Sequence, residues 1–397
     1  MKAMTMTAKR YKQPGGVSLF VVIFAMLLFT IITVGFIRLM VQNQAQASAT
    51  NLSEGANDAA QTGVEDGKRA IVAYLKQGCE TSSSTACTAF NDPATGAGVN
   101  CQTAITSMLG AGMFNNGEVK VENASGMNEA YTCVKVLMNT PDYVGQLKSA
   151  GDSVVVPLLS DTPFDTVKIN WYKSTDTGAG TTTTVPAALF PLRADWSSSL
   201  HAPPILESQL MQVPNGRFNM PSDTQNDLKA PSGDAEAMLL YPSTAPQGAA
   251  TLTDNALGNP TAVHCDAANL KTGGYACSAT FRVPAPVGGG VSNRYALMRL
   301  SSYYAGAHFQ VELANGCTPE APGCPAVNFK GVEPSIDSTG RAGDILSRVI
   351  TRVVLLSPNY EYPNAAVSTE GQFCKTFSIT DNPADYNADP NATGCTP

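Results

Sequence analysis

The hydrophobic pattern of the chain begins with one long uncharged segment. No residue from Val17 to Ile37 carries a charge. Twenty-one helical residues rising about 1.5 Å each reach across the roughly 30 Å hydrocarbon core of a bilayer. Four basic residues and no acidic residue lie within 1–16, which favours a cytoplasmic N-terminus. We therefore predict a transmembrane helix over 17–37, with everything after Arg38 extracytoplasmic.

A cleaved secretory signal peptide is the alternative interpretation of this segment. Ala45-Gln46-Ala47 has the small-x-small pattern of a cleavage site. The apolar run is longer than the usual signal core of about 7–15 residues, and polar residues separate it from that site. The length mismatch favours a membrane span that is not removed by signal peptidase.

The helical pattern continues well beyond the apolar run. No proline occurs between Val41 and Leu75, and apolar or small residues recur at spacings of three and four. We predict one helix over 17–76, with 38–76 amphipathic. Small residues also lie four apart, a spacing that lets another backbone approach closely. This ladder either seats the helix on its own head or packs it against another subunit, and it consists of Gly55, Ala59, Gly63 and Gly67.

The remaining residues, 77–397, are predicted to form a β-rich head, so the fold class is α+β. Polar and apolar residues alternate over 166–172, 277–283 and 308–313, as in half-buried strands. Further predicted strands are 131–138, 154–159, 238–241, 295–304 and 348–356. The last of these is apolar on both faces, which predicts a central strand or a short buried helix. If the head has two lobes, the turn-rich residues 214–233 are the best boundary by composition.

Ten cysteines lie beyond the predicted span. An even number of extracytoplasmic cysteines indicates disulfides in an oxidising compartment. Short loops close at the lowest entropic cost, which favours local pairs. No CxxC pair occurs and only His264 adjoins a cysteine, so a metal site is not expected. The predicted pairs are Cys79–Cys87, Cys101–Cys133, Cys265–Cys277, Cys317–Cys324 and Cys374–Cys395.

Charge and candidate chemistry narrow the function classes. A net charge of -7 argues against a nucleic-acid partner, since phosphate binding requires a basic surface. Residues 290–294 begin like a nucleophile elbow but lack its closing glycine. The three histidines show no catalytic spacing, and the aspartates near the C-terminus suit turns as well as calcium. We expect no enzymatic activity, no cofactor and no metal. The residues considered are His201, His264, His308, Asp381, Asp385 and Asp389.

The N-terminal residues resemble a type IV prepilin. The basic leader ends in Lys12-Gln13-Pro14-Gly15-Gly16, an apolar stretch starts at once, and an amphipathic stretch follows. In that family a prepilin peptidase cuts after the glycine, which implies a leader over 1–16, cleavage after Gly16 and a methylated Val17 as the first mature residue. Residues 56–69 are similar to the corresponding stretch of PilX-like minor pilins, and the resemblance covers about residues 9–76.

One departure from the family pattern concerns the fifth mature position. Most pilins carry a glutamate there, which meets the N-terminal amine of a neighbouring subunit, whereas this chain has Val21. The resemblance therefore implies a pilin-like fold and a minor subunit of a type IV pilus or related pseudopilus. It would reside in the cytoplasmic membrane before assembly and on the cell surface afterwards. Implied partners are other pilin subunits, the prepilin peptidase, the membrane and an unknown surface ligand. The alternative is a stand-alone single-pass adhesin or receptor.

Overall fold

The computed structural model describes residues 17–121, 128–177, 202–213, 235–243, 260–288, 295–316 and 325–355. The chain divides into two compact units, Met1–Leu356 and Ser357–Pro397. All described residues belong to the first unit. The predicted leader, residues 1–16, and the C-terminal aspartates considered above lie outside the described residues, as do His201 and residues 290–294.

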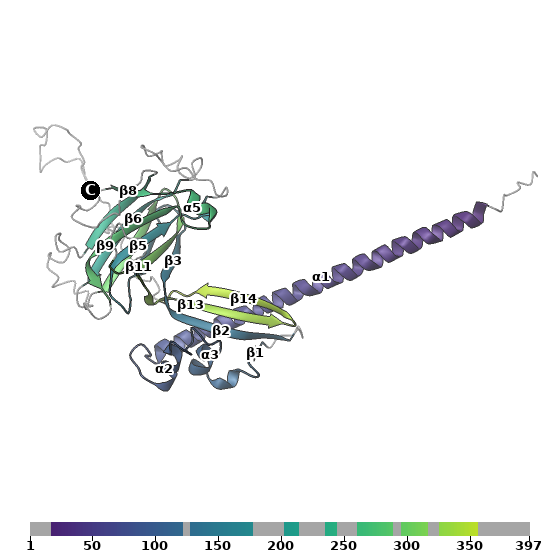
Figure 1. Cartoon of the computed structure of the whole chain (residues 1–397), viewed down its shortest axis with the longest axis horizontal. Coiled ribbons are helices and arrows are strands. Elements are labelled where there is room, and N and C mark those ends of the chain that lie inside the picture. The colour runs from purple at the N-terminus through teal and green to yellow at the C-terminus, as the bar shows by residue number, and fades with distance from the viewer. Residues whose placement is uncertain are drawn as a thin grey trace, which may run out of the picture. The chain divides into compact units, whose positions relative to one another are not determined.

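A single helix, α1 (Val17–Lys76), forms the N-terminal 60 residues of the described chain (Figure 1). It has the bounds that the periodicity predicts. Side chains of its first half are exposed, whereas small and apolar residues of its second half, including Ala56, Ala60 and Ile71, are buried. The long apolar helix followed by a large β-rich region confirms the α+β class.

The second half of α1 packs on a four-stranded antiparallel sheet. Its strand order is β1 (Val119–Lys120), β2 (Glu129–Thr140), β13 (Phe329–Ala342) and β14 (Ile345–Arg352). Two short helices, α2 (Thr85–Asn91) and α3 (Thr103–Met108), and the 3₁₀ turn η1 (Ala111–Met113) follow α1 in the chain. The apolar core of this part is formed by side chains of α1, α2, α3, β2 and β13, including Ile71, Phe90, Ile105, Tyr131, Val134 and Ile336.

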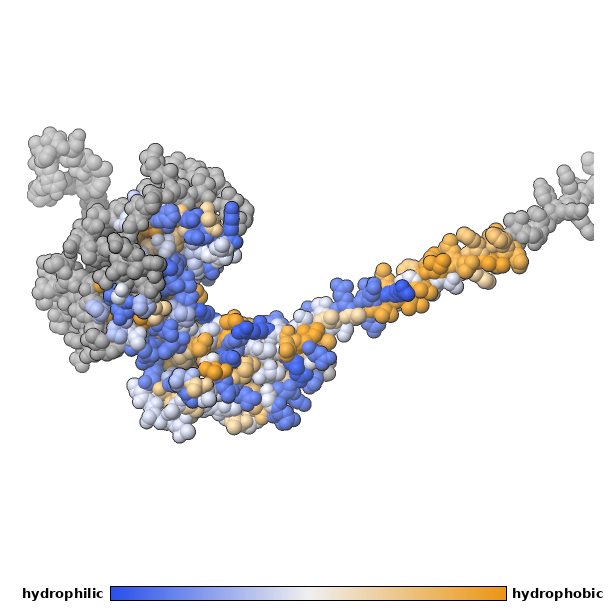
Figure 2. Space-filling model, in the orientation of Figure 1, coloured by the Kyte–Doolittle hydropathy of each residue, from blue (hydrophilic) through white to orange (hydrophobic). Residues whose placement is uncertain are grey.

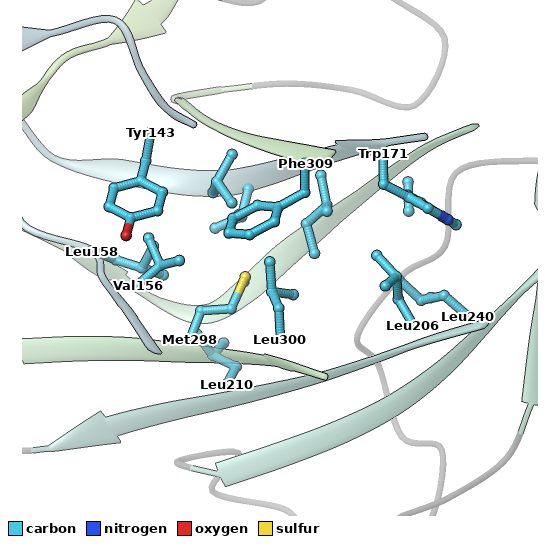
Figure 3. Close-up of a cluster of buried hydrophobic side chains, with 14 of the residues drawn as sticks. Tyr143, Val156, Leu158, Trp171, Leu206, Leu210, Leu240, Met298, Leu300 and Phe309 are labelled. Atoms are coloured by element: carbon cyan, nitrogen blue, oxygen red, sulfur yellow. The ribbon is translucent and has the colours of Figure 1, made fainter. Parts of the chain in front are cut away.

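The other β-strands form a sandwich of two sheets around one core (Figure 3). Trp171 and Phe309 of one sheet face Leu206 and Met298 of the other, and the Trp171 indole donates to the Pro204 carbonyl. The first sheet has the order β4 (Ser153–Pro157), β10 (Tyr295–Tyr303), β6 (Ile205–Val213), β7 (Ala235–Ser243), β8 (Pro260–His264). The second has the order β12 (Ala326–Val327), β11 (Ala307–Ala314), β5 (Phe164–Trp171), β9 (Cys277–Val287), and β3 (Asp142–Leu147) also pairs with β11.

The sandwich is an insertion between two neighbouring strands of the helix-bound sheet. The chain leaves β2 at Thr140, and it returns at Phe329, which pairs with Thr140 across the sheet. Residues 214–233, proposed above as a lobe boundary, lie outside the described residues. The strands on either side of them, β6 and β7, pair with each other.

The structure corrects the prediction of a central strand or buried helix over 348–356. β14 lies at the edge of its sheet, and Leu346 and Ile350 are 63% and 58% exposed. The apolar residues on both faces do not mean that both faces are buried. One face of β14 contacts α1, whereas the other is exposed and carries arginines between its apolar residues. These two arginines, Arg348 and Arg352, bind Asp337 and Asp142.

Three disulfides close local loops in the described residues. They are Cys79–Cys87, Cys101–Cys133 and Cys265–Cys277, three of the five predicted pairs. The second holds the segment before α3 against β2, where the Val134 N–H also donates to the Cys101 carbonyl. Residues 317, 324, 374 and 395 lie outside the described residues, so the other two pairs stay predictions.

Candidate functional site: the N-terminal helix and its seat on the sheet

The first half of α1 presents apolar side chains on every side. From Leu19 to Val41 the large hydrophobic side chains are between 44% and 77% exposed (Figure 2). Thr30 and Thr33 donate their hydroxyls to carbonyls one turn earlier, at 2.8 and 2.7 Å, so neither leaves a polar group unsatisfied. Within the described ranges, α1 is the one helix long and apolar enough to cross a membrane.

Two predicted features of this half can be located. Val17 is the first residue of α1, directly after the predicted leader. Val21, the fifth residue of α1, is 59% exposed, and it presents no carboxylate at this position. Gly16 lies outside the described residues, and cleavage there stays a prediction.

The small-residue ladder seats α1 on its own sheet. A Cβ atom at Gly55 would lie 2.6 Å from the Glu129 carboxylate, and one at Gly67 would lie 2.7 Å from the Ile336 side chain. At Gly63 it would overlap the hydroxyl of Ser338, and Ala59 is fully buried. Of the two roles left open by the spacing, these four positions therefore serve packing within the chain.

The sheet contributes a matching small residue that the sequence analysis missed. Gly340 of β13 lies directly beneath α1, and a Cβ atom there would overlap main-chain atoms of Ala56 and Ala60. A glycine inside a strand often marks close approach of another backbone, but the alternation of residues predicts no strand around Gly340. Close backbone contact is therefore built from both sides of the interface.

A buried carboxylate fixes the helix on the sheet electrostatically. Asp66 of α1 is only 5% exposed, and it accepts a hydrogen bond of 2.7 Å from the Tyr131 hydroxyl and one of 2.9 Å from Arg69. Burial, followed by the hydrogen bond to Asp66, raises the pKa of Tyr131 above its ordinary value. Tyr131 therefore stays a neutral donor, and the pair specifies the register of α1 on β2.

In the sandwich, His308 pairs with a carboxylate. The Nδ1 atom of His308 lies 2.5 Å from the Asp176 carboxylate, whose other oxygen accepts the His308 main-chain N–H. The Thr175 hydroxyl lies 3.5 Å from this same Nδ1, which already faces Asp176. In a hydroxyl nucleophile–histidine pair, the other ring nitrogen, Nε2, would have to face the hydroxyl as the base. His264 is exposed beside the Cys265–Cys277 disulfide. Nowhere in the described residues do three histidine, cysteine or acidic side chains converge as metal ligands.

No protein family, curated protein or solved structure matches the chain. Function is therefore inferred from the residues and their arrangement.

Proposed function

We propose that the chain is a minor subunit of a type IV pilus or related pseudopilus, which anchors by α1 and presents its sandwich for filament priming and surface attachment. The observation that carries this proposal is the division of α1. Its first half is bare and apolar, whereas its second half is fixed to an antiparallel sheet.

Both halves of α1 suit a subunit that leaves the membrane and enters a filament. The bare half can lie in lipid or among apolar helices of other subunits, because both surroundings are apolar. The seated half has its small-residue ladder occupied by β2 and β13. Contacts with neighbouring subunits are therefore expected from the bare half, between Leu19 and Val41.

The proposed role as a minor subunit rests on the missing carboxylate at Val21 and on the size of the sandwich. An N-terminal ammonium in an apolar filament core is costly without a carboxylate, and Val21 supplies none to a neighbour. The inserted sandwich adds a second reason, because a large domain on every subunit would crowd closely spaced helices.

Position in the filament can be tested directly. Sheared filaments should contain this chain at low stoichiometry, with immunogold label at their ends. Val21→Glu should increase label along the shaft, whereas Val21→Leu, the matched control, should leave the end label unchanged. Uniform label along wild-type filaments would contradict a minor role. Absence of the chain from filaments, with all of it retained in the membrane, would favour the stand-alone adhesin or receptor.

A further inference from the structure

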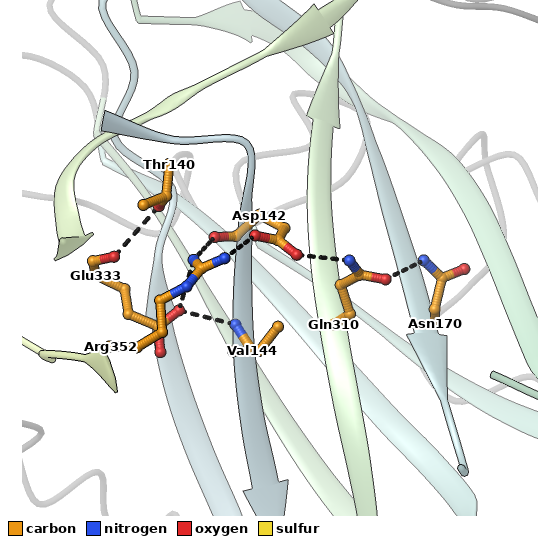
Figure 4. Close-up of polar contacts among 7 residues, drawn as sticks. All are labelled: Thr140, Asp142, Val144, Asn170, Gln310, Glu333 and Arg352. Carbon is orange, nitrogen blue, oxygen red and sulfur yellow. Dashed lines mark hydrogen bonds and ion pairs between the residues drawn. The ribbon is translucent and has the colours of Figure 1, made fainter. Parts of the chain in front are cut away.

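Two strands carry the chain between the helix-bound sheet and the sandwich. β2 runs through Pro141 into β3, and β13 begins opposite the end of β2. Side chains of β3, β13 and β14 meet at this joint (Figure 4). We call Asp142, Val144, Glu333 and Arg352 the joint cluster.

Glu333 is the buried member of the joint cluster. It is only 3% exposed, and its Oε2 atom accepts the Val144 N–H at 2.9 Å. The Thr140 hydroxyl donates to the Glu333 main-chain carbonyl at 3.3 Å. The Glu333 side chain thus links β13 to β3 through a main-chain group of the sandwich.

Arg352, the one guanidinium in the joint cluster, is bound mainly to Asp142 and not to Glu333. Arg352 lies 2.6 Å from the Asp142 carboxylate and donates to the Asp142 carbonyl at 3.0 Å, but it is 3.5 Å from Glu333. Asp142 also accepts a 2.6 Å hydrogen bond from Gln310. Two carboxylates therefore share one cation, and Glu333 has the weaker contact with it.

Two tyrosines near Glu333 carry no compensating charge. Burial, with the nearby Glu333 charge, raises the pKa of Tyr143 on β3 to about 12. Burial also raises the pKa of Tyr275, in the loop before β9, and the charges of Asp142, Asp176, Glu312 and Glu333 raise it further. Both tyrosines are thus neutral near pH 7. Burial raises the pKa of Glu333 itself to about 7, and the Asp142 charge acts in the same direction, against the Val144 N–H and Arg352.

We propose that Glu333 makes this joint pH-sensitive. When protonated, its side chain remains buried against β3. When ionised, it draws Arg352 away from Asp142 and admits water, so that β3 loosens from β13 and β14. This inference concerns the joint alone and is independent of the pilus proposal.

The sign of the pH dependence follows from linkage. The pKa of Glu333 is raised from an ordinary 4.5 to about 7 in the folded chain. Between these values the folded state binds more protons than the unfolded state, so stability falls as the pH rises. The stabilisation is complete below about pH 4.5 and is lost above about pH 7.

Hydrogen exchange of the full-length chain in detergent tests the proposal. After correction for intrinsic exchange rates, the Val144 amide of β3, which donates to Glu333, should lose protection about tenfold or more between pH 5 and pH 8. Glu333→Gln, which keeps the shape but cannot ionise, should remove this dependence. Glu312→Gln, a half-exposed carboxylate on neighbouring β11, should retain it. Equal wild-type protection at both pH values, or an unchanged dependence in Glu333→Gln, would overturn the proposal.

A second measurement does not depend on the variant folding. Carbon NMR of the wild-type chain, labelled at glutamate carboxyls, should show one glutamate titrating near pH 7. Titration of every glutamate in its ordinary range would overturn the proposal.

Discussion

At the scale of single residues, glycines decide how closely α1 approaches its sheet. Gly63 and Gly67 of α1 leave room for Ser338 and Ile336, and Gly340 of β13 leaves room for the helix backbone. Each glycine in a helix costs about 1 kcal/mol of helix propensity relative to alanine. Packing offsets that cost at the seated positions, where a methyl group would collide.

Two glycine-to-alanine substitutions should differ in their effect on stability. Gly340→Ala should lower the free energy of unfolding by about 1–3 kcal/mol, because its Cβ atom would meet main-chain atoms of Ala56 and Ala60. Gly35→Ala in the bare half should not lower it, because nothing lies within 4 Å of that Cβ atom. Thermal unfolding of full-length chains in detergent, followed by circular dichroism, measures both. Equal losses for the two variants would show that Gly340 has no special packing role.

At the scale of elements, disulfides hold together the segments that connect α1, α3 and β2. Cys79–Cys87 closes a separation of 8 residues after α1, and Cys101–Cys133 closes one of 32 residues between the segment before α3 and β2. In the loop-entropy account the longer loop stabilises more, about 3.7 against about 2.5 kcal/mol.

Paired serine substitutions test this ranking. Cys101→Ser with Cys133→Ser should destabilise the chain more than Cys79→Ser with Cys87→Ser, by about 1 kcal/mol. Chemical denaturation under non-reducing conditions provides the comparison. A larger loss for the short loop would mean that native packing around Cys79 and Cys87, both buried, outweighs loop entropy.

The sequence predicts which segments form helices and strands better than it predicts which of them pack together. Uninterrupted periodicity gives α1 its bounds, and alternation locates β5, β9 and β11. The central strand β13 was missed because its sequence, with Gly331, Pro334 and Gly340, is typical of a loop. Its small residues are required by the helix above it, which is a long-range constraint. The same limit applies to the seat of the glycine ladder and to Glu333, whose surroundings come from three separate strands.

At the scale of the whole molecule, the sandwich is an insertion into a smaller helix-and-sheet fold. Thr140 and Phe329 are paired neighbours, so a short turn can join them. Each part has its own apolar core. The helix-and-sheet part should therefore tolerate loss of the sandwich.

Excision of the sandwich tests this modular arrangement. Replacing 141–328 with Asn-Gly, a two-residue hairpin turn, should leave a membrane-inserted chain that still forms the Cys79–Cys87 and Cys101–Cys133 disulfides. Non-reducing peptide mapping and limited proteolysis check the outcome. A variant with scrambled disulfides and no protected fragment would show that the helix-bound sheet needs the sandwich to fold.

Mass spectrometry of the native N-terminus decides whether the proposed pilin-like subunit is processed as a prepilin. If it is, the mature chain begins at Val17. Gly16→Glu should leave the leader attached, whereas Gly15→Ala, the matched control one residue earlier, should still be processed. A mature start at Ser48 would instead indicate signal peptidase and would contradict the pilin assignment.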